Sequence, residues 1–462
     1  MKKILGSMTA AAVVASTLTF ANVSPANAAA PNFTYSTGFQ IQNLSQATAT
    51  VSLAFYAQGS GTPSATVPDT IPAGSSKNYS TLPSAVAAGF SGGAVISSDQ
   101  KVAATVNIIV NNNVNFGDAY TGISEGSTKA TLPLLFKDAF GFNTFFNVQN
   151  TDATAAAVTV TFSNGTTQTA TVQPNSTARF DQASNAGIAA NFIGSAVVTA
   201  DKNIAVTAVQ VDNDTLASYN GFSDTGNLAP IFPLVNSNNF GYVTGIPVTN
   251  VGTAATNVVV TYTPSSGIAG NATAPCTETQ SVAANETKYF ALTSIGPSAN
   301  TPGMTTTCTK GARFVGSGKV TTNSGNQPLV ALVSQLNQPA KKSGIYGAAN
   351  ATTATSTVLF PIINDRFFGY NTGFSITNVG NNNVNVSCSY AGQTYKDEVS
   401  ALAPGGVFTT LQTGKLADRT NTSGTCVATA VGGSDAKIVG VINQLNNPAA
   451  TDALFVSSGI NN

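Results

Sequence analysis

The chain has 462 residues, of which only 8% are charged, and its 19 Lys and Arg residues balance its 19 Asp and Glu residues. A formal charge of zero leaves no basic field to neutralise phosphates, so no nucleic-acid partner is expected. The absence of histidine removes the commonest general base and metal ligand, which excludes Ser-His-Asp and Cys-His mechanisms and leaves only carboxylate or lysine chemistry open.

The first 28 residues have the pattern of a cleavable signal peptide. Lys2 and Lys3 provide a basic start, Ile4–Ala21 is mostly apolar, and the following segment NVSPANA ends in a small-x-small pattern. Cleavage is expected after Ala28; the alternative is an N-terminal membrane anchor. No later stretch of about 20 apolar residues occurs, so we expect a secreted, cell-surface protein with no membrane-spanning segment.

The rest of the chain repeats one unit four times, which we predict to be the organising feature of the fold. Each unit begins with aromatic-x-Thr-x-apolar-x-apolar-x-Asn, then has a turn followed by an aromatic residue, and closes with an apolar strand. The opening motifs are YSTGFQIQN (Tyr35–Asn43), FNTFFNVQN (Phe142–Asn150), YVTGIPVTN (Tyr242–Asn250) and YNTGFSITN (Tyr370–Asn378). The closing strands are Val102–Val110, Ile204–Val211, Leu329–Leu336 and Ile438–Leu445.

The pattern within each unit is that of antiparallel β-structure. In the second unit Val158, Val160 and Phe162 alternate with threonines, Asn164-Gly165 favours a tight turn, and Gln168–Val172 returns as the partner strand. Period-2 alternation places the apolar residues on one face, so two sheets can pack together. About 100 residues with roughly seven short strands is typical of an immunoglobulin-like (Ig-like) sandwich.

We therefore predict an all-β protein with four tandem Ig-like antiparallel β-sandwich domains after the signal peptide. The predicted ranges are 1–28 for the signal peptide and 29–124, 125–225, 226–352 and 353–462 for the repeats, the last including a C-terminal tail. Asn213–Asn227 and Lys341–Ser356 have the composition of short linkers and favour a semi-rigid rod. This architecture resembles tandem Ig-like surface proteins of bacteria, such as surface-layer, sheath, filament and adhesin-stalk proteins.

The four cysteines agree with export. Cys276 and Cys308 fall in the third repeat, and Cys388 and Cys426 fall in the fourth. Two cysteines per repeat in an exported protein indicate the disulfides Cys276–Cys308 and Cys388–Cys426, each worth roughly 3–4 kcal/mol in the chain-entropy description. The alternative, a metal site, needs clustered ligands at short spacing, and these are absent.

Few other residues suggest chemistry, and we expect neither an enzyme nor a cofactor. Asp212-Asn213-Asp214 offers oxygens for Ca²⁺ but lacks the glycine and distal glutamate of a calcium loop, which favours an Asx-rich turn. Asp365-Arg366 is predicted to be a weak surface ion pair. The aromatic residues that open the motifs could stack on sugars, but their recurrence favours core or interdomain packing. These aromatic residues are Tyr35, Phe142, Tyr242 and Tyr370.

The first strand of each repeat is marked by a proline, except in repeat one. Pro133, Pro233 and Pro361 lie in apolar segments 17 residues before the anchor asparagines, as expected for an edge strand. The equivalent position in repeat one, residue 26, falls in the signal-peptide cleavage region. The mature first repeat is therefore predicted to lack its first strand, which would leave an open sheet edge.

The C-terminal tail offers a strand that could fill this site in another subunit. Its residues Ala453, Leu454, Phe455 and Val456 resemble Val358–Pro361, the first strand of repeat four. The hypothesis is head-to-tail β-strand addition, which builds a filament because it does not close on itself. Two alternatives remain: alignment of Phe455 with Tyr346 makes the tail the end of repeat four, and Phe33 with Tyr35 can form a short edge in repeat one.

The function expected from the sequence is that of a structural protein that self-associates at the bacterial cell surface as a surface-layer, sheath or filament subunit. Its low and balanced charge favours association. The expected partners are further copies of the chain and a cell-envelope or glycan component. The alternative is an adhesin or a carbohydrate- or matrix-binding stalk with ligand contacts on loops.

Overall fold

The computed structural model describes residues 12–18, 33–112, 114–223, 226–291, 303–309, 311–323, 325–446 and 452–461. The described residues form strands, turns and loops, and none of them lies in a helix. The predicted all-β class is therefore confirmed. Each repeat has two antiparallel layers, which are separate sheets in repeats one, three and four and one continuous eight-stranded sheet in repeat two. We refer to the four repeats as units one to four.

Unit one contains the sheets β1-β6-β3-β4 and β5-β2-β7-β8. Its strands are β1 (Ala12–Leu18), β2 (Thr34–Asn43), β3 (Ala49–Ala57), β4 (Pro63–Ile71), β5 (Ser76–Tyr79), β6 (Gly92–Ser98), β7 (Val102–Asn112) and β8 (Val114–Thr121). In unit two one long strand, β14, runs through both layers: its first half pairs with β9 and β11, and its second half with β10 and β15. The strands of unit two are β9 (Ser127–Lys137), β10 (Asn143–Asn150), β11 (Ala156–Phe162), β12 (Thr167–Val172), β13 (Thr177–Asp181), β14 (Phe192–Val211), β15 (Leu216–Asn220) and β16 (Phe222–Ser223).

Units three and four repeat the same two-sheet arrangement. The strands of unit three are β17 (Pro230–Ser237), β18 (Val243–Asn250), β19 (Thr256–Pro264), β20 (Cys276–Val282), β21 (Thr287–Ala291), β22 (Thr305–Thr306), β23 (Phe314–Thr322), β24 (Leu329–Asn337), β25 (Lys342–Gly347) and β26 (Ala349–Asn350). The strands of unit four are β27 (Thr357–Asp365), β28 (Asn371–Asn378), β29 (Asn383–Tyr390), β30 (Lys396–Leu402), β31 (Val407–Leu411), β32 (Thr420–Val431), β33 (Ile438–Leu445), β34 (Leu454–Ser458) and β35 (Ile460–Asn461).

The repeated asparagine that ends each opening motif joins backbone segments of its unit by side-chain hydrogen bonds. Asn43, Asn150, Asn250 and Asn378 are all fully buried. In every unit the side-chain amide donates to the carbonyl four residues later and to a carbonyl at the end of the fourth strand, and its oxygen accepts the N–H two residues later. The side chain thus satisfies backbone groups that a tight turn would otherwise leave unpaired, which explains the repetition of asparagine.

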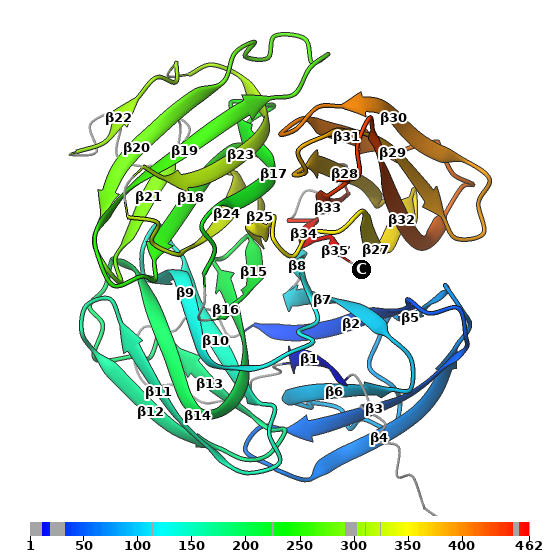
Figure 1. Cartoon of the computed structure of the whole chain (residues 1–462). Helices are drawn as coiled ribbons and strands as arrows, with labels where there is room; N and C mark the ends of the chain where they lie inside the picture. Colours follow the sequence, from blue (N-terminus) through cyan, green and yellow to red (C-terminus); the bar gives the residue numbers. More distant parts are fainter. Residues whose placement is uncertain are drawn as a thin grey trace, which may run out of the picture.

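The four units surround a common centre and do not form the predicted rod (Figure 1). The segments that we predicted to be linkers contain β15 and β25, which lie at this centre with β8 and β34. These four strands contact one another in cyclic order, β8 to β15 to β25 to β34 and back to β8. The rod prediction is wrong because each of these short strands is the edge of its own unit and also a wall of the shared centre.

The first strands place each unit against the next one around this centre. Strand β9 of unit two packs on β18 and β24 of unit three, β17 of unit three packs on β28 and β33 of unit four, and β27 of unit four packs on β2 and β7 of unit one. Strand β1 completes the cycle by packing on β10 and β14 of unit two. The arrangement is therefore a closed ring with pseudo-fourfold symmetry.

The interfaces of the ring differ in polarity. The apolar core of unit one continues into unit two through Phe145 and Leu216, that of unit two into unit three through Leu332 and Ile345, and that of unit three into unit four. Within the described ranges, the apolar core of unit four does not extend into unit one. A side-chain hydrogen bond crosses that last interface instead, from Gln40 Nε2 to the carbonyl of Pro361.

Candidate functional site

The first-strand site of unit one is the feature most relevant to assembly. Strand β1 pairs antiparallel with β6, with Val13 opposite Ile96 and Ala15 opposite Ala94. A register shift follows, between Ala15 and Leu18. The prolines of the other first strands lie at the same kind of shift, namely Leu132–Leu135, Phe232–Val235 and Phe360–Ile363. The site therefore has the same bulged geometry in all four units, and a bulge tolerates proline because its N–H need not pair.

The strand that occupies this site in unit one comes from the predicted signal peptide. Ser16, and not residue 26 as the spacing suggested, stands where the other units have proline. Ala15 stands where units two, three and four place the fully buried side chains of Leu132, Phe232 and Phe360. A small apolar cavity lies between the two sheets of unit one, beside the β6 residues that pair with β1. It is lined by Thr37, Phe39, Leu53, Phe55, Ala94, Ile96, Val106 and Tyr120.

Tyr120 and Asn147 are polar residues beside this site, and the equivalent residues of other units bind a first strand. Tyr219 donates its hydroxyl to the carbonyl of Leu134 at 2.6 Å, and Tyr346 binds Leu234 in the same way; Tyr120 holds the equivalent position in unit one. Asn147 of β10 is equivalent to Gln40, but its buried side chain has no hydrogen-bond partner among the residues that the structure describes. The site is therefore built to bind a strand, and an unpaired polar group remains beside it.

The second feature is a central carboxylate that connects all four units. Asp118 of β8 is fully buried, and it accepts the N–H groups of Ser218 and Val456 at 2.6 Å each. The N–H groups of Ala119 and Ile345 complete the set. These four donors occupy equivalent positions on β8, β15, β25 and β34. One side chain therefore satisfies one backbone donor from each unit.

A second aspartate repeats this arrangement one layer away. Asp452 is fully buried and accepts the N–H groups of Leu216, Ser343 and Leu454 at 3.1–3.3 Å, while its backbone carbonyl accepts Gly117 N–H at 3.2 Å. Burial raises the pKa of both Asp118 and Asp452 well above the ordinary aspartate value, although the N–H donors oppose the shift. We call these two residues and the four strands around them the hub.

The hub was not predicted from the sequence, and it determines the position of the C-terminal tail. Leu454–Ser458 pairs with β33 as the edge strand of unit four, so in the single chain the tail completes its own unit. Leu454, Phe455 and Val456 are buried, and Phe455 packs edge-on against Tyr370 at 5.6 Å. Phe455 lies opposite Gln444, which makes it equivalent to Gly344 of unit three. The predicted alignment of Phe455 with Tyr346 is therefore wrong, although the tail is the end of unit four.

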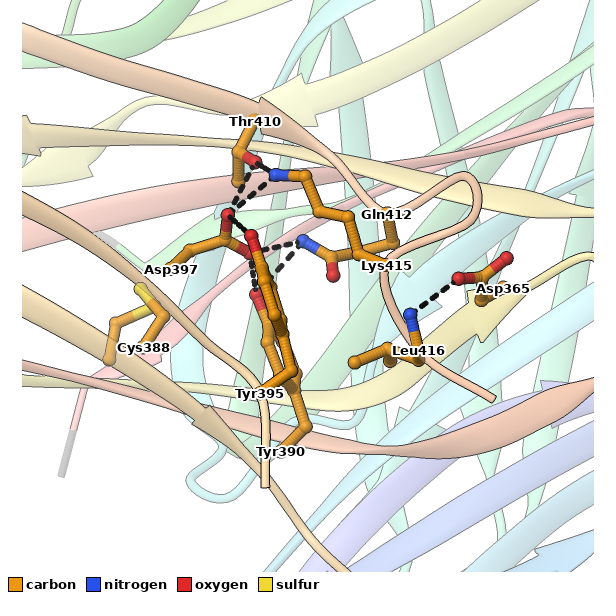
Figure 2. Close-up of polar contacts among 10 residues, drawn as sticks. Asp365, Cys388, Tyr390, Tyr395, Asp397, Thr410, Gln412, Lys415 and Leu416 are labelled. Atoms are coloured by element: carbon orange, nitrogen blue, oxygen red, sulfur yellow. Dashed lines mark hydrogen bonds and ion pairs between the residues drawn. A yellow bond between two sulfur atoms is a disulfide. The ribbon is translucent and has the colours of Figure 1, made fainter. Parts of the chain in front are cut away.

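Both predicted disulfides are present, Cys276–Cys308 and Cys388–Cys426. The second is buried and lies beside a polar cluster centred on Asp397 (Figure 2). The carboxylate of Asp397 accepts hydrogen bonds from Tyr395 and Thr410 at 3.0 Å, from Gln412 at 2.7 Å and from Lys415 at 2.5 Å, and Tyr390 also donates to it. Burial opposes the charge on Asp397, but these bonds outweigh it and lower its pKa.

Glu278 of unit three occupies the position equivalent to Asp397, but its pKa is shifted in the opposite direction. Glu278 lies opposite Val260, as Asp397 lies opposite Cys388, and it is buried with a single hydrogen bond, at 2.7 Å, from Tyr262. Its other carboxylate oxygen has no hydrogen-bond partner in the described part of the chain. Burial raises the pKa of Glu278 to about 7, and the bond from Tyr262 opposes only part of the shift. Both acids bind side chains of their own units: Asp397 binds residues of β29, β31 and the loops beside them, and Glu278 binds Tyr262 of β19.

This contrast predicts opposite pH responses. Because the folded-state pKa of Glu278 exceeds the unfolded value, its stabilising effect is complete below about pH 4.5 and is lost as the pH rises through 7, by roughly 3 kcal/mol. Urea unfolding of the chain and of Glu278→Gln at pH 5 and pH 8 should show a loss of stability at pH 8 that the variant lacks. Asp397→Asn should instead be less stable than the parent at neutral pH. This difference in stability should disappear only in acid, as the pH falls below about 4. Parallel pH profiles for the parent and Glu278→Gln would contradict this assignment.

The remaining predicted positions have structural roles. Asp212 accepts the N–H groups of Asp214 and Thr215 in an Asx turn, and Asp214 pairs with Lys341 across two units at 2.9 Å. No group of three or more acidic, cysteine or histidine residues suited to a metal occurs among the described residues. Asp365 is fully buried, so its pair with Arg366 is not the surface pair we predicted. Its carboxylate also accepts the N–H of Leu416 (Figure 2) and the N–H of Gly414.

The motif-opening aromatic residues pack inside the ring. Tyr35 and Phe142 are buried, and Tyr242 and Tyr370 are partly buried. Tyr35 contacts Phe145 of unit two at 5.9 Å between ring centroids. The interpretation as core and interdomain packing thus describes them better than sugar stacking.

Comparisons with known proteins add no family to this description. No protein-family model matches the chain, and no curated protein matches it. Within the described part of the chain, no helix has the length and apolar character needed to cross a membrane.

Proposed function

We propose that this protein is an exported structural protein that self-associates at the bacterial cell surface, as a subunit of a surface layer, sheath or filament. The observation that carries the proposal is the first-strand site of unit one. Its occupant, Ala12–Leu18, lies within the predicted signal peptide, so cleavage after Ala28 would empty the site. The two disulfides and the low, balanced charge are compatible with an extracellular, associating protein.

An emptied site would bind a replacement strand. The outer edge of β6 (Gly92–Ser98) would present unpaired backbone groups, and the apolar core behind Ala94 and Ile96 would be exposed to water. Such an edge is a template for strand addition from another chain. The small apolar cavity lies beside the Ala15 position, so a donor with an apolar residue larger than alanine there would also reduce this cavity.

The C-terminal tail of a second copy is the donor that the sequence matches best. Leu454-Phe455 of the tail corresponds to Leu359-Phe360 of β27, so Phe455 would occupy the Ala15 position. In the single chain the tail is bound at the hub by Asp118. Its transfer to a neighbouring ring would therefore cost those hub contacts, which the new strand pairing must offset. A contact of this head-to-tail kind does not close and generates a filament.

The test compares the chain beginning at Ala29 with the full chain, by light scattering after size-exclusion chromatography and by negative-stain electron microscopy. The chain from Ala29 should form filaments or sheets, and a synthetic peptide of residues 11–19 in excess should return it to single rings. A peptide with Val13 and Val14 replaced by aspartate is the control. Deletion of residues 452–462 should abolish assembly if the tail is the donor. Persistently monomeric rings from Ala29, with or without peptide, would contradict the proposal.

Adhesion remains the second candidate, because aromatic side chains project from turns of three units. Phe140, Phe240 and Phe368 are 80%, 83% and 68% exposed. Retention of the monomeric chain on glycan or matrix-protein beads, together with an absence of assembly, would favour this function over the structural one.

A further inference from the structure

Three phenylalanine side chains project from equivalent turns of the ring. Phe140, Phe240 and Phe368 each precede a glycine in the turn between the first and second strands of units two, three and four. The equivalent residue of unit one, Phe33, is buried against Phe116 at 5.5 Å. We call the three exposed residues the phenylalanine rim.

The backbone of these turns holds each ring outward at a conformational cost. The φ angles of Phe140, Phe240 and Phe368 are 53°, 49° and 48°, in the left-handed region that bulky side chains rarely adopt. Glycine or asparagine would fit these positions with less strain, yet phenylalanine occurs in all three turns. A residue that is both strained and exposed, in three copies within one chain, is better explained by contact with a partner than by packing.

The ring places the rim on one of its two faces. Strands β10, β18 and β28 all begin just after these turns and run toward their anchor asparagines at the opposite ends of the strands. Because the units are related by rotation about the hub, equivalent turns lie at the same end of the axis. The rim therefore forms three separate apolar points on one face, and not a single cavity for a small ligand.

Arginine side chains lie over two of the three exposed phenylalanines. The guanidinium groups of Arg313 and Arg419 lie over the rings of Phe240 and Phe368, at 5.0 Å and 5.1 Å from their centroids. Neither arginine forms an ion pair with a described carboxylate, whereas Lys341 and Arg366 are paired with acids. The exposed Asp138 beside Phe140 is bound by Asn143. Two points of the rim thus combine an apolar tip with an arginine that has no described acidic partner, whereas the third, at Phe140, has the Asp138 carboxylate beside it.

We propose that the phenylalanine rim docks this face of the ring on an anionic lipid surface. Phenylalanine tips can enter the boundary between headgroups and acyl chains, and arginines beside them can bind lipid phosphates. A flat partner can engage all three points at once, and such multivalent contact strengthens individually weak insertions. A second copy of the chain fits less well, because face-to-face packing would bring the unpaired arginines of both copies together. The proposal is independent of strand addition at unit one.

A fluorescence titration tests the proposal, because the chain contains no tryptophan. Phe240→Trp introduces a single reporter, which should shift its emission to the blue when vesicles of phosphatidylcholine with phosphatidylglycerol are added. Vesicles of phosphatidylcholine alone should bind several-fold more weakly, as should anionic vesicles in high salt. The matched control is Leu228→Trp. Leu228 is 52% exposed and lies next to Asn227, which bridges to Leu329 at the opposite end of unit three.

Vesicle sedimentation of the parent chain and of the triple variant Phe140→Ala/Phe240→Ala/Phe368→Ala completes the test. The triple variant should lose at least tenfold in vesicle affinity and keep the same elution volume and unfolding transition. Equal binding of both chains, or equal blue shifts at positions 240 and 228, would overturn the proposal. So would a change of oligomeric state in the triple variant without a change in lipid binding, because the rim would then be a contact between copies.

Discussion

Replacement of Asp118 by alanine is expected to lower the free energy of unfolding by about 3–5 kcal/mol, because it leaves buried backbone donors of all four units without an acceptor. The carboxylate has no substitute at this position: the equivalent residues of the other hub strands are Ala217, Gly344 and Phe455. Asp118→Asn retains one acceptor oxygen and should lose less stability than Asp118→Ala.

Differential scanning calorimetry, together with hydrogen exchange of the hub strands, measures this effect. In Asp118→Ala, protection should fall in β15, β25 and β34 as well as in β8, because the lost acceptor serves all of them. The control is Asp201→Ala, which removes an exposed carboxylate bonded to Ala157 N–H and should cost about 1 kcal/mol or less. A loss of protection confined to unit one would show that Asp118 does not couple the units.

The double substitution Cys388→Ala/Cys426→Ala is expected to lower the stability of unit four by about 3–4 kcal/mol, from the larger conformational freedom of its unfolded chain. Both cysteines are buried beside the Asp397 cluster, so a slight loosening of β29 against β32 should also expose that cluster. Thermal unfolding should then show an early transition from unit four. Reduction of the parent chain should reproduce it.

The double substitution Cys276→Ala/Cys308→Ala provides the comparison in unit three. This disulfide joins β20 to the loop after β22, and both of its cysteines are only partly buried. It should produce an early transition in unit three and leave unit four unchanged. A single unchanged transition in both double variants would contradict the view that the disulfides stabilise individual units.

The sequence predicted the parts of this fold that depend on local patterns. The motif around Asn150 returns because the asparagine side chain performs the same hydrogen bonding in every unit. Alternation at Val158, Val160 and Phe162 predicts the β11–β12 hairpin, whose turn has Gly165 at a φ of 87°. Two cysteines in each of two repeats were enough to indicate their pairing.

The ring could not be predicted, because its determinants do not repeat. Asp118 has no counterpart in the other units, and its partners are backbone N–H groups, which leave no trace in a sequence. Leu216–Asn220 and Lys342–Gly347 are short and flanked by residues typical of turns, so they have the composition of linkers. Nothing in a single repeat indicates that such a strand will meet three others at a centre.

The first-strand site was predicted in part. A constant spacing from proline to the anchor asparagine correctly indicated that repeat one is irregular. It pointed to residue 26, whereas the structure places Ser16 in the bulge, because a longer connection separates β1 from β2. Spacing cannot reveal such a change of length. The phenylalanine rim went unnoticed for a different reason: Phe140, Phe240 and Phe368 lie just outside the motif that aligned the repeats.

Closure of the four units into one ring is the central claim, because the hub, the first-strand site and the rim all depend on it. Small-angle X-ray scattering of the full chain tests it most directly. A compact body of this length should have a radius of gyration of about 22 Å and a bell-shaped distance distribution. A radius of gyration of roughly twice that value, with the distance distribution of an elongated rod, would contradict closure.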